Sequence, residues 1–313
     1  MKTPAVSFLF FLACTSVILV QPACRHATPG PDPLAALYSN TQVIGDIVYK
    51  TAGPHSLKLD AYIPVTRLGE PPWVEYSPDL KPVLFFLHGG GWTSGNKISR
   101  SLFLMPFLSK GFCVVTADYR LLSQASLPEI ISDTRAALRW IYDHSRQYKF
   151  DTARIVVSGE SAGGHLALMN GVLNESSRFP PDSNEAGHEL KVAAVVNWFG
   201  VADLVKASSD WDSVYLSQVA GPDPAKTTTV LRSCSPVNYV DAHTVPILTI
   251  HGSEDRAANY DQALLLHDIL GKKGIKNQLL TIPGKKHGNF NSREMDQAMQ
   301  EIWNFLSSIQ ILN

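Results

Sequence analysis

Six short apolar runs between residues 83 and 282 constrain the fold of this chain more than any other feature of its sequence. Runs of this length, bounded by polar or turn-forming residues, are typical of strands in a parallel sheet that is covered on both faces. The runs span residues 83–87, 112–117, 155–157, 192–198, 247–250 and 278–282. We therefore expect these segments to form the centre of one buried sheet.

Helical patterns fall between these runs. They cover residues 128–144, 161–173, 260–270 and 295–309, where apolar residues recur at helical spacing or alanine and leucine are abundant. Alternating strands and helices predict an α/β fold with a doubly wound sheet, whose functional groups gather beyond the carboxyl ends of the strands. A length of 313 residues is compatible with a single domain of this kind.

The segments around this core have weaker patterns. Residues 47–49 and 57–63 alternate between apolar and polar side chains, which predicts an antiparallel pair of strands and places the start of the domain, 45–313, near residue 45. Residues 64–82 contain several prolines and predict a surface excursion without a regular element. The mixed polar and aromatic residues of 201–244 predict a short cap over the sheet.

The sequence Gly-Glu-Ser-Ala-Gly-Gly at residues 159–164 stands directly between a predicted strand and a predicted helix. A serine hydroxyl is a poor nucleophile, so it needs exposure, a nearby base and hydrogen-bond donors for the developing oxyanion. A sharp strand-to-helix turn exposes the serine, and small neighbours let that turn close. Ser161 is therefore the candidate nucleophile, and the Ala162 amide is a candidate oxyanion donor.

A glycine-rich loop, His-Gly-Gly-Gly-Trp at residues 88–92, follows the apolar run 83–87. Together with the serine turn, this loop resembles the hormone-sensitive-lipase-like and the feruloyl and acetylxylan esterase-like branches of the α/β-hydrolases. The resemblance implies a mostly parallel eight-stranded sheet flanked by helices, with the Gly90 and Gly91 amides completing the oxyanion hole. It also implies a structural role for His88.

A block after the run 112–117 extends the resemblance. Asp118-Tyr119-Arg120-Leu121, followed by Pro128, Asp133 and Trp140, is similar to a largely structural block of these esterases. The resemblance implies that Asp118 and Arg120 form a fixed ion pair near the site.

A catalytic histidine and its acid are expected late in the chain. His287 follows the last predicted strand, and Asp255 follows the strand before it, which gives the order Ser, Asp, His of this fold. The carboxylate would hold the imidazole in the required tautomer and stabilise the imidazolium. His251 is the rival base, while Asp203 and Glu254 are the alternative acids.

One departure from the family lies directly after the candidate acid. Many relatives carry a Val-Pro pair there, whereas this chain has Arg256-Ala257-Ala258-Asn259. Lys285 and Lys286 precede the candidate base, and we interpret them as a solvated face of the loop.

The N-terminal segment has the features of a signal peptide. Lys2 precedes the apolar stretch 6–20, which is shorter than the roughly 20 residues of a membrane-spanning helix. We expect residues 1–23 to direct export, 24–44 to form a linker and the protein to be secreted or periplasmic. Cys24 resembles the lipid-acceptor cysteine of bacterial lipoproteins, so a lipid-anchored form is the alternative.

Charge and cysteine content narrow the classes of partner. The formal net charge is −1, and the charged residues are scattered, which argues against nucleic acid as a partner. No metal-binding spacing of cysteines is present. A disulfide between Cys113 and Cys234 stays open at this stage, although a buried free thiol at Cys113 is favoured.

These features predict a serine carboxylesterase that needs no metal or organic cofactor. Trp92, Trp198 and Trp211 are candidates for the wall of a substrate pocket. A short cap favours small acyl groups or aromatic acyl groups such as feruloyl, on small molecules or on plant polysaccharide. The alternatives are an arylformamidase or serine peptidase on the same scaffold, or a hydrolase-like binding protein without catalysis. The sequence does not indicate an oligomeric state.

Overall fold

The computed structural model describes residues 40–67, 74–76, 79–173, 179 and 190–312. The predicted signal peptide 1–23 and the candidate lipid site Cys24 lie outside these residues. Within them, every helix is too short or too polar to cross a bilayer.

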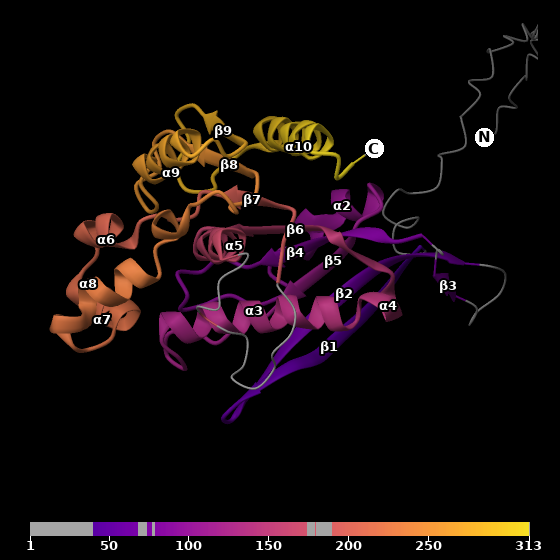
Figure 1. Ribbon diagram of the computed structural model, residues 1–313, viewed down its shortest axis with the longest axis horizontal. Coiled ribbons are helices and arrows are strands. Elements are labelled where there is room, and N and C mark those ends of the chain that lie inside the picture. Colours follow the sequence, from indigo (N-terminus) through magenta and orange to yellow (C-terminus); the bar gives the residue numbers. More distant parts are fainter. Residues whose placement is uncertain (1–39, 68–73, 77–78, 174–178, 180–189, 313) are drawn as a thin grey trace, which may run out of the picture.

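The described strands form one twisted sheet, shown in Figure 1. Its order is β1-β2-β5-β4-β6-β7-β8-β9, and β3 pairs with β2. The strands are β1 (Thr41–Ala52), β2 (His55–Arg67), β3 (Val74–Tyr76), β4 (Lys81–Leu87), β5 (Cys113–Ala117), β6 (Phe150–Glu160), β7 (Ala194–Trp198), β8 (Ile247–Gly252) and β9 (Asn277–Ile282). Strands β1, β2 and β5 pair antiparallel, whereas all neighbours from β5 to β9 are parallel.

The sheet confirms the predicted fold class, and each apolar run lies within or overlaps a parallel strand. Boundaries in the N-terminal part of the sheet differ from the prediction, and β2 runs on to Arg67 beyond the predicted end at residue 63. Strand β1 begins at Thr41, inside the predicted linker, and β3 lies inside the predicted excursion 64–82. Both segments pair with the long strand β2 through backbone hydrogen bonds, which need no apolar pattern.

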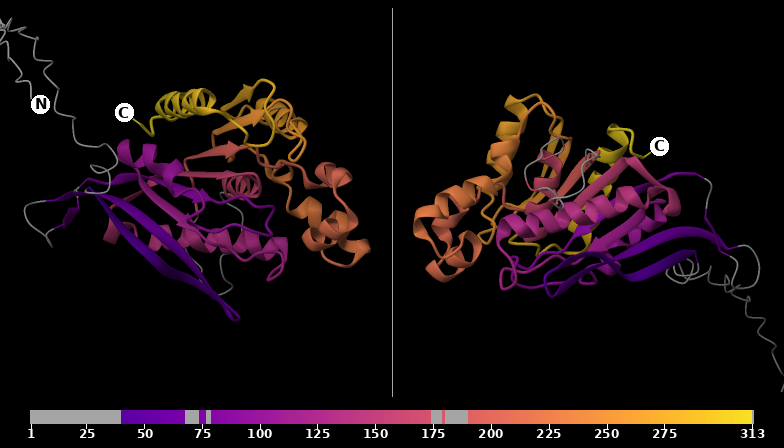
Figure 2. Two further views of the ribbon diagram at one scale, coloured as in Figure 1. Left: turned by 180° about the vertical axis from the view of Figure 1, so that it is seen from behind. Right: turned by 60° about the horizontal axis from the view of Figure 1, so that its bottom comes forward.

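Helices cover both faces of the sheet, as Figures 1 and 2 show. Side chains of α3, α5 and α9 belong to one buried cluster, and side chains of α2 and α10 belong to the other. Strand β4 is apolar from residue 82 to its end because its side chains enter both clusters: Phe85 packs into the first and Phe86 into the second. These helices are α2 (Met105–Ser109), α3 (Leu127–Asp143), α5 (Ala162–Val172), α9 (Asp261–Lys272) and α10 (Ser292–Ser308), with α4 (Ser145–Tyr148) short.

The region predicted as a cap folds into three short helices and two 3-10 turns. They are α6 (Leu204–Ala207), α7 (Ser213–Ala220) and α8 (Pro224–Ser233), and they group beyond one end of the sheet in both figures. The Tyr215 hydroxyl of α7 donates to the Gly91 carbonyl at 3.2 Å. The Trp211 ring, which precedes α7, meets Trp92 edge to face. The cap therefore contacts the glycine-rich loop directly.

The ion pair expected between Asp118 and Arg120 is not formed. Arg120 instead donates to Asp133 of α3, from Nε at 2.7 Å and from Nη2 at 2.9 Å. Lys50 of β1 also contacts Asp133, at 3.2 Å. Asp118 accepts the backbone N–H of Lys97 at 2.7 Å. The sequence places Asp133 two helical turns into α3, and only the packing of α3 against the sheet brings its buried carboxylate to Arg120.

Cys113 and Cys234 are both buried and both carry free thiols, so no disulfide joins them. Burial raises the pKa of the Cys113 thiol to about 12. Cys113 is the first residue of β5, and its side chain is fully buried. This burial agrees with the expected role as a small apolar side chain.

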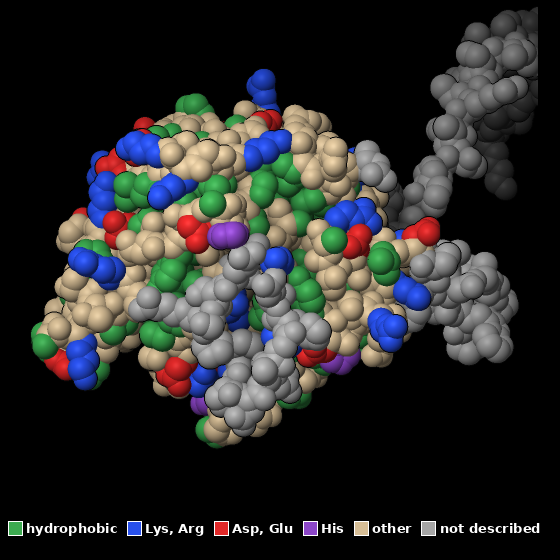
Figure 3. Space-filling view, viewed as in Figure 1, with side chains coloured by type: hydrophobic (Ala, Val, Ile, Leu, Met, Phe, Trp, Pro, Cys, Tyr) green, Lys and Arg blue, Asp and Glu red, His purple; other side chains and the backbone are tan. Residues whose placement is uncertain are grey.

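On the face shown in Figure 3, basic and acidic side chains are interspersed, as they are along the sequence. No large patch of one sign is visible on that face.

We expect the variant Arg120→Met to lower the free energy of unfolding by about 3 kcal/mol, because it leaves the buried Asp133 carboxylate with fewer compensating donors. Arg154→Met is the matched control, since Arg154 pairs with the half-buried Asp151 near the surface and should contribute less than about 1 kcal/mol. Urea denaturation of both variants measures the difference. Equal losses would contradict the structural role of Asp133.

Candidate active site

Ser161 lies at the sharp turn between β6 and α5. Its backbone has φ of 54° and ψ of −118°, a left-handed conformation that costs a non-glycine residue about 1–3 kcal/mol. The flanking glycines are required by space: a Cβ on Gly163 would lie 2.0 Å from the Leu87 carbonyl oxygen, and a Cβ on Gly159 would lie 2.3 Å from that of Gly163. The turn therefore packs against the end of β4 and holds the serine in a strained, fixed position.

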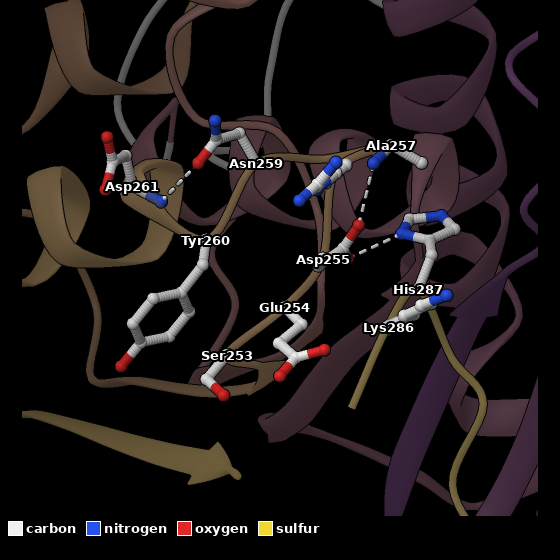
Figure 4. A pocket seen from close by; sticks show the side chains of 10 residues that line it. Ser253, Glu254, Asp255, Ala257, Asn259, Tyr260, Asp261, Lys286 and His287 are labelled. Carbon is white, nitrogen blue, oxygen red and sulfur yellow. Dashed lines mark hydrogen bonds and ion pairs between the residues drawn. The ribbon is translucent and has the colours of Figure 1, made fainter. Parts of the chain in front are cut away.

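Ser161, His287 and Asp255 form an unbroken row of hydrogen bonds. The His287 Nε2 atom lies 2.8 Å from the Ser161 hydroxyl oxygen, and its Nδ1 atom lies 2.7 Å from Asp255 Oδ2. Figure 4 shows the second of these contacts. With the Nδ1–H donating to the carboxylate, Nε2 is the acceptor for the serine proton. The structure thus brings together three residues from distant parts of the chain.

Backbone contacts fix the loop of the acid against the loop of the base. The Glu254 N–H donates to the Lys285 carbonyl at 2.9 Å, and the Gly284 N–H donates to the Ser253 hydroxyl at 2.9 Å. A Cβ on Gly252 would lie 2.2 Å from the Lys285 oxygen. This close approach after β8 and β9 holds His287 at the distance from Asp255 that a hydrogen bond requires.

The Asp255 carboxylate is buried and surrounded by donors. Its Oδ1 atom accepts the N–H groups of Ala257 at 2.9 Å and Ala258 at 3.1 Å. Burial by itself raises the pKa of Asp255, but hydrogen bonds from His251 and His287 outweigh it and hold the pKa well below its usual value. The carboxylate is therefore ionised over the whole neutral range.

His251, the rival base, contacts the acid and not the serine. Its ring is fully buried, and its Nε2 atom lies 3.2 Å from Asp255 Oδ2 and 2.8 Å from the Ala258 carbonyl oxygen. The sequence predicts His251 only as an alternative base, and the structure gives it a supporting position beside Asp255. The available signal is that His251 lies at the end of the strand that Asp255 follows.

The alternative acids lie elsewhere. Asp203 caps α6 by accepting the Lys206 N–H at 3.1 Å, and its own N–H donates to Gln262. Glu254 is exposed, and Figure 4 shows its carboxylate apart from His287. Neither carboxylate bonds His287 within the described residues.

The candidate oxyanion donors have the backbone geometry that only glycine adopts easily. Gly90 has φ of 117° and Gly91 φ of 60°, and a Cβ on Gly90 would lie 2.2 Å from the Ser94 oxygen. Within the described residues, the N–H groups of Gly90, Gly91 and Ala162 have no hydrogen-bond acceptor. These three amides are therefore available to a ligand oxygen.

His88 anchors the glycine-rich loop. Its ring stacks on Tyr119 with centroids 4.2 Å apart, and the Tyr119 hydroxyl donates to the His88 carbonyl at 2.7 Å. Burial lowers the pKa of His88, so the ring stays neutral.

The three tryptophans predicted to wall a pocket lie in two places. Trp92 and Trp211 meet each other between the glycine-rich loop and the cap. Trp198 ends β7, and its ring packs on Phe103 in the cluster formed with α2 and α10. Trp92 and Trp211 thus lie near the candidate oxyanion donors, whereas the Trp198 side chain lies in the core.

Groups of three or more side chains that could hold a metal ion are absent from the described part of the chain.

Comparisons with known proteins agree with this geometry. The family profile named BD-FAE matches residues 74–270. A probable carboxylic ester hydrolase, LipM of Mycobacterium tuberculosis, is 31% identical over 245 residues, which cover 75% of this chain and 53% of LipM. A probable isoprenylcysteine alpha-carbonyl methylesterase of Arabidopsis thaliana is 25% identical over 74% of this chain and 48% of its own length. This chain thus spans about half the length of these two relatives.

Solved structures share the fold. A carbohydrate esterase from gut microbiota superposes with a TM-score of 0.71 at 24% identity, covering 85% of this chain and 96% of that one. Esterase Est2 of the planctomycete Thermogutta terrifontis superposes with a TM-score of 0.70 at 25% identity, covering 87% and 94%. Because the family profile covers more than half of the residues, this chain belongs to the BD-FAE family of the α/β-hydrolase superfamily.

Proposed function

We propose that this protein is a serine hydrolase that cleaves carboxylic esters through an acyl-enzyme. The observation that carries the proposal is the row of hydrogen bonds from Ser161 through His287 to the buried Asp255. The names of the relatives, a carboxylic ester hydrolase and several esterases, support it.

The geometry supports the following sequence of steps. Ser161 Oγ attacks the ester carbonyl carbon while His287 Nε2 takes the hydroxyl proton. The Gly90, Gly91 and Ala162 amides would donate to the oxyanion, and ionised Asp255 stabilises the imidazolium. His287 then returns the proton to the departing alcohol oxygen as the ester C–O bond breaks. Water repeats both steps on the acyl-enzyme and releases the acid.

We further propose that the acyl group is short or aromatic and that esters of plant polysaccharide are among the natural substrates. The cap comprises only short helices, and two tryptophans and Tyr215 already occupy the space between it and the glycine-rich loop. Long alkyl chains need an extended apolar channel, whereas aromatic rings fill this region. One solved relative is a carbohydrate esterase, which agrees with this choice.

We expect Ser161→Ala and His287→Ala each to lower kcat by about 10⁴-fold or more, because each removes a group that acts in the transition state. Asp255→Asn should cost about 10³- to 10⁴-fold, because it removes the charge that fixes the imidazole tautomer. Hydrolysis of 4-nitrophenyl acetate by purified variants measures these changes.

Asp203→Asn is the control for this series, since Asp203 caps α6 and does not contact His287. Its rate should stay within about twofold of the parent enzyme. A larger loss for Asp203→Asn than for Asp255→Asn in folded proteins would refute the assignment of the acid. A hydrolase-like binding protein would show no turnover that depends on Ser161.

Acid should weaken the contribution of Asp255 to stability. Because the pKa of Asp255 is lower in the folded chain than its unfolded value of about 3.9, the contribution is complete above that value and is lost as the pH falls further. The difference in unfolding free energy between the parent and Asp255→Asn should therefore shrink from pH 4.5 to pH 3. Urea denaturation at both values measures it, and a difference that grows on acidification would exclude a lowered pKa.

The proposed acyl preference predicts a sharp decline of kcat/KM with chain length. The kcat/KM of the acetyl and butyryl esters of 4-nitrophenol should exceed that of the palmitoyl ester by at least about tenfold, because aromatic rings occupy the space between the cap and the glycine-rich loop. Hydrolysis rates measure this preference when each ester is used at the same concentration and that concentration is too low for the palmitoyl ester to aggregate. Preference for the palmitoyl ester would disprove a short-acyl enzyme.

A further inference from the structure

Each backbone carbonyl of the glycine-rich loop 88–92 accepts a hydrogen bond. Four of these carbonyls are held by donors within residues 88–122. The donors are the Tyr119 hydroxyl to His88 at 2.7 Å, the His88 ring Nδ1 to Gly89 at 2.8 Å, the Thr93 and Ser94 N–H groups to Gly90 at 3.0 and 3.1 Å, and the Leu122 N–H to Trp92 at 2.8 Å. The remaining carbonyl, that of Gly91, accepts the hydroxyl of Tyr215 in the cap at 3.2 Å. The cap thus supplies one of the bonds that fix the loop of the candidate oxyanion donors.

The Gly91 carbonyl belongs to the peptide group that joins two left-handed residues. Gly91 has φ of 60° and Trp92 φ of 56°. Glycine adopts this conformation readily, whereas in tryptophan it is strained and persists only where the surroundings hold it. Without an anchor, this peptide group can relax by rotating about ψ of Gly91 and φ of Trp92.

Packing holds the Trp92 side chain in place. Its ring is buried and meets His165 of α5 edge to face, with centroids 5.1 Å apart. On the cap side it meets Trp211 at 6.5 Å, and Trp211 in turn meets the ring of Tyr215 at 5.0 Å. These contacts fix the tryptophan ring, whereas the orientation of the peptide group before it depends on the hydrogen bond to its carbonyl.

Tyr215 is itself fixed as a donor. It lies in the first turn of α7, where its N–H donates to the N-cap residue Asp212 at 2.8 Å. Burial raises the pKa of the Tyr215 phenol to about 12, so the hydroxyl keeps its proton through the neutral range. Because a carbonyl oxygen can only accept, the hydroxyl donates to Gly91.

We propose that Tyr215 is a positioning residue for the oxyanion hole, and that its hydroxyl holds the peptide group after Gly91 so that the Gly91 N–H stays aimed at the transition-state oxygen. The inference rests on the proposed esterase function. The Gly91 N–H and the held carbonyl lie on either side of one α-carbon, so rotation of one peptide group shifts the other. Donors that are oriented before the reaction stabilise the developing oxyanion without reorganisation. A cap residue therefore raises the rate of the chemical step by acting through the loop.

The variant Tyr215→Phe tests this role, because it removes the hydroxyl and keeps the ring that packs on Trp211. We expect kcat for 4-nitrophenyl acetate to fall about fivefold while KM stays within about twofold, since the lost bond supports the transition state more than the bound ester. The inhibition constant of a short trifluoromethyl ketone should rise by a similar factor, because its hemiketal with Ser161 places a negative oxygen at the same amides.

Tyr239→Phe is the matched control. This second cap tyrosine also donates to a backbone carbonyl, that of Ser233 at 2.6 Å, which lies outside the glycine-rich loop. Its kcat and its inhibition constant for the ketone should stay within about twofold of the parent values. Rates are normalised to the sites that a fluorophosphonate titrates at completion, so that a partly unfolded preparation does not imitate a lower kcat.

The outcomes separate the two proposals. Tyr215→Phe could match Tyr239→Phe, raise KM at unchanged kcat, or lower kcat without weakening the ketone. Each of these results would overturn the positioning role and leave the esterase proposal intact. A parent protein without hydrolysis that depends on Ser161 would overturn the esterase proposal and this inference with it.

Discussion

The site depends on one imidazole ring that bonds a strained serine on one side and a buried carboxylate on the other. His287 can make both contacts only because three strand ends, those of β6, β8 and β9, meet at one edge of the sheet. Close backbone contacts there require glycine at positions 159, 163 and 252. The parallel sheet and its glycines therefore set the distances between Ser161, His287 and Asp255, and the buried core keeps those strands in register.

The groups around Asp255 keep its carboxylate ionised. Asp255 is buried, which alone would favour its neutral form, yet two histidines and two backbone amides donate to it or lie within donating distance. The same backbone hydrogen bonds shape the turn that follows Asp255.

Much of this arrangement could be predicted because it is local in the sequence. Ser161 stands between an apolar run and a helical pattern, and Asp255 and His287 follow the last two predicted strands, so their types and spacing point to one edge of a parallel sheet. Contacts set by packing could not be predicted in this way. Arg120 pairs with Asp133 and not with Asp118, and His251 contacts Asp255, because helix and strand positions in three dimensions decide both. Strand β3 could not be predicted, because its pairing with β2 leaves no apolar pattern in the sequence.

The central claim is that Ser161 is the covalent nucleophile, and trapping the modified residue tests it most directly. The folded protein should be incubated with a fluorophosphonate, digested and mapped by mass spectrometry. We predict one phosphonyl group on the peptide that contains Ser161, formed only while His287 is intact. A label on another residue, or equal labelling of the His287→Ala variant, would contradict it.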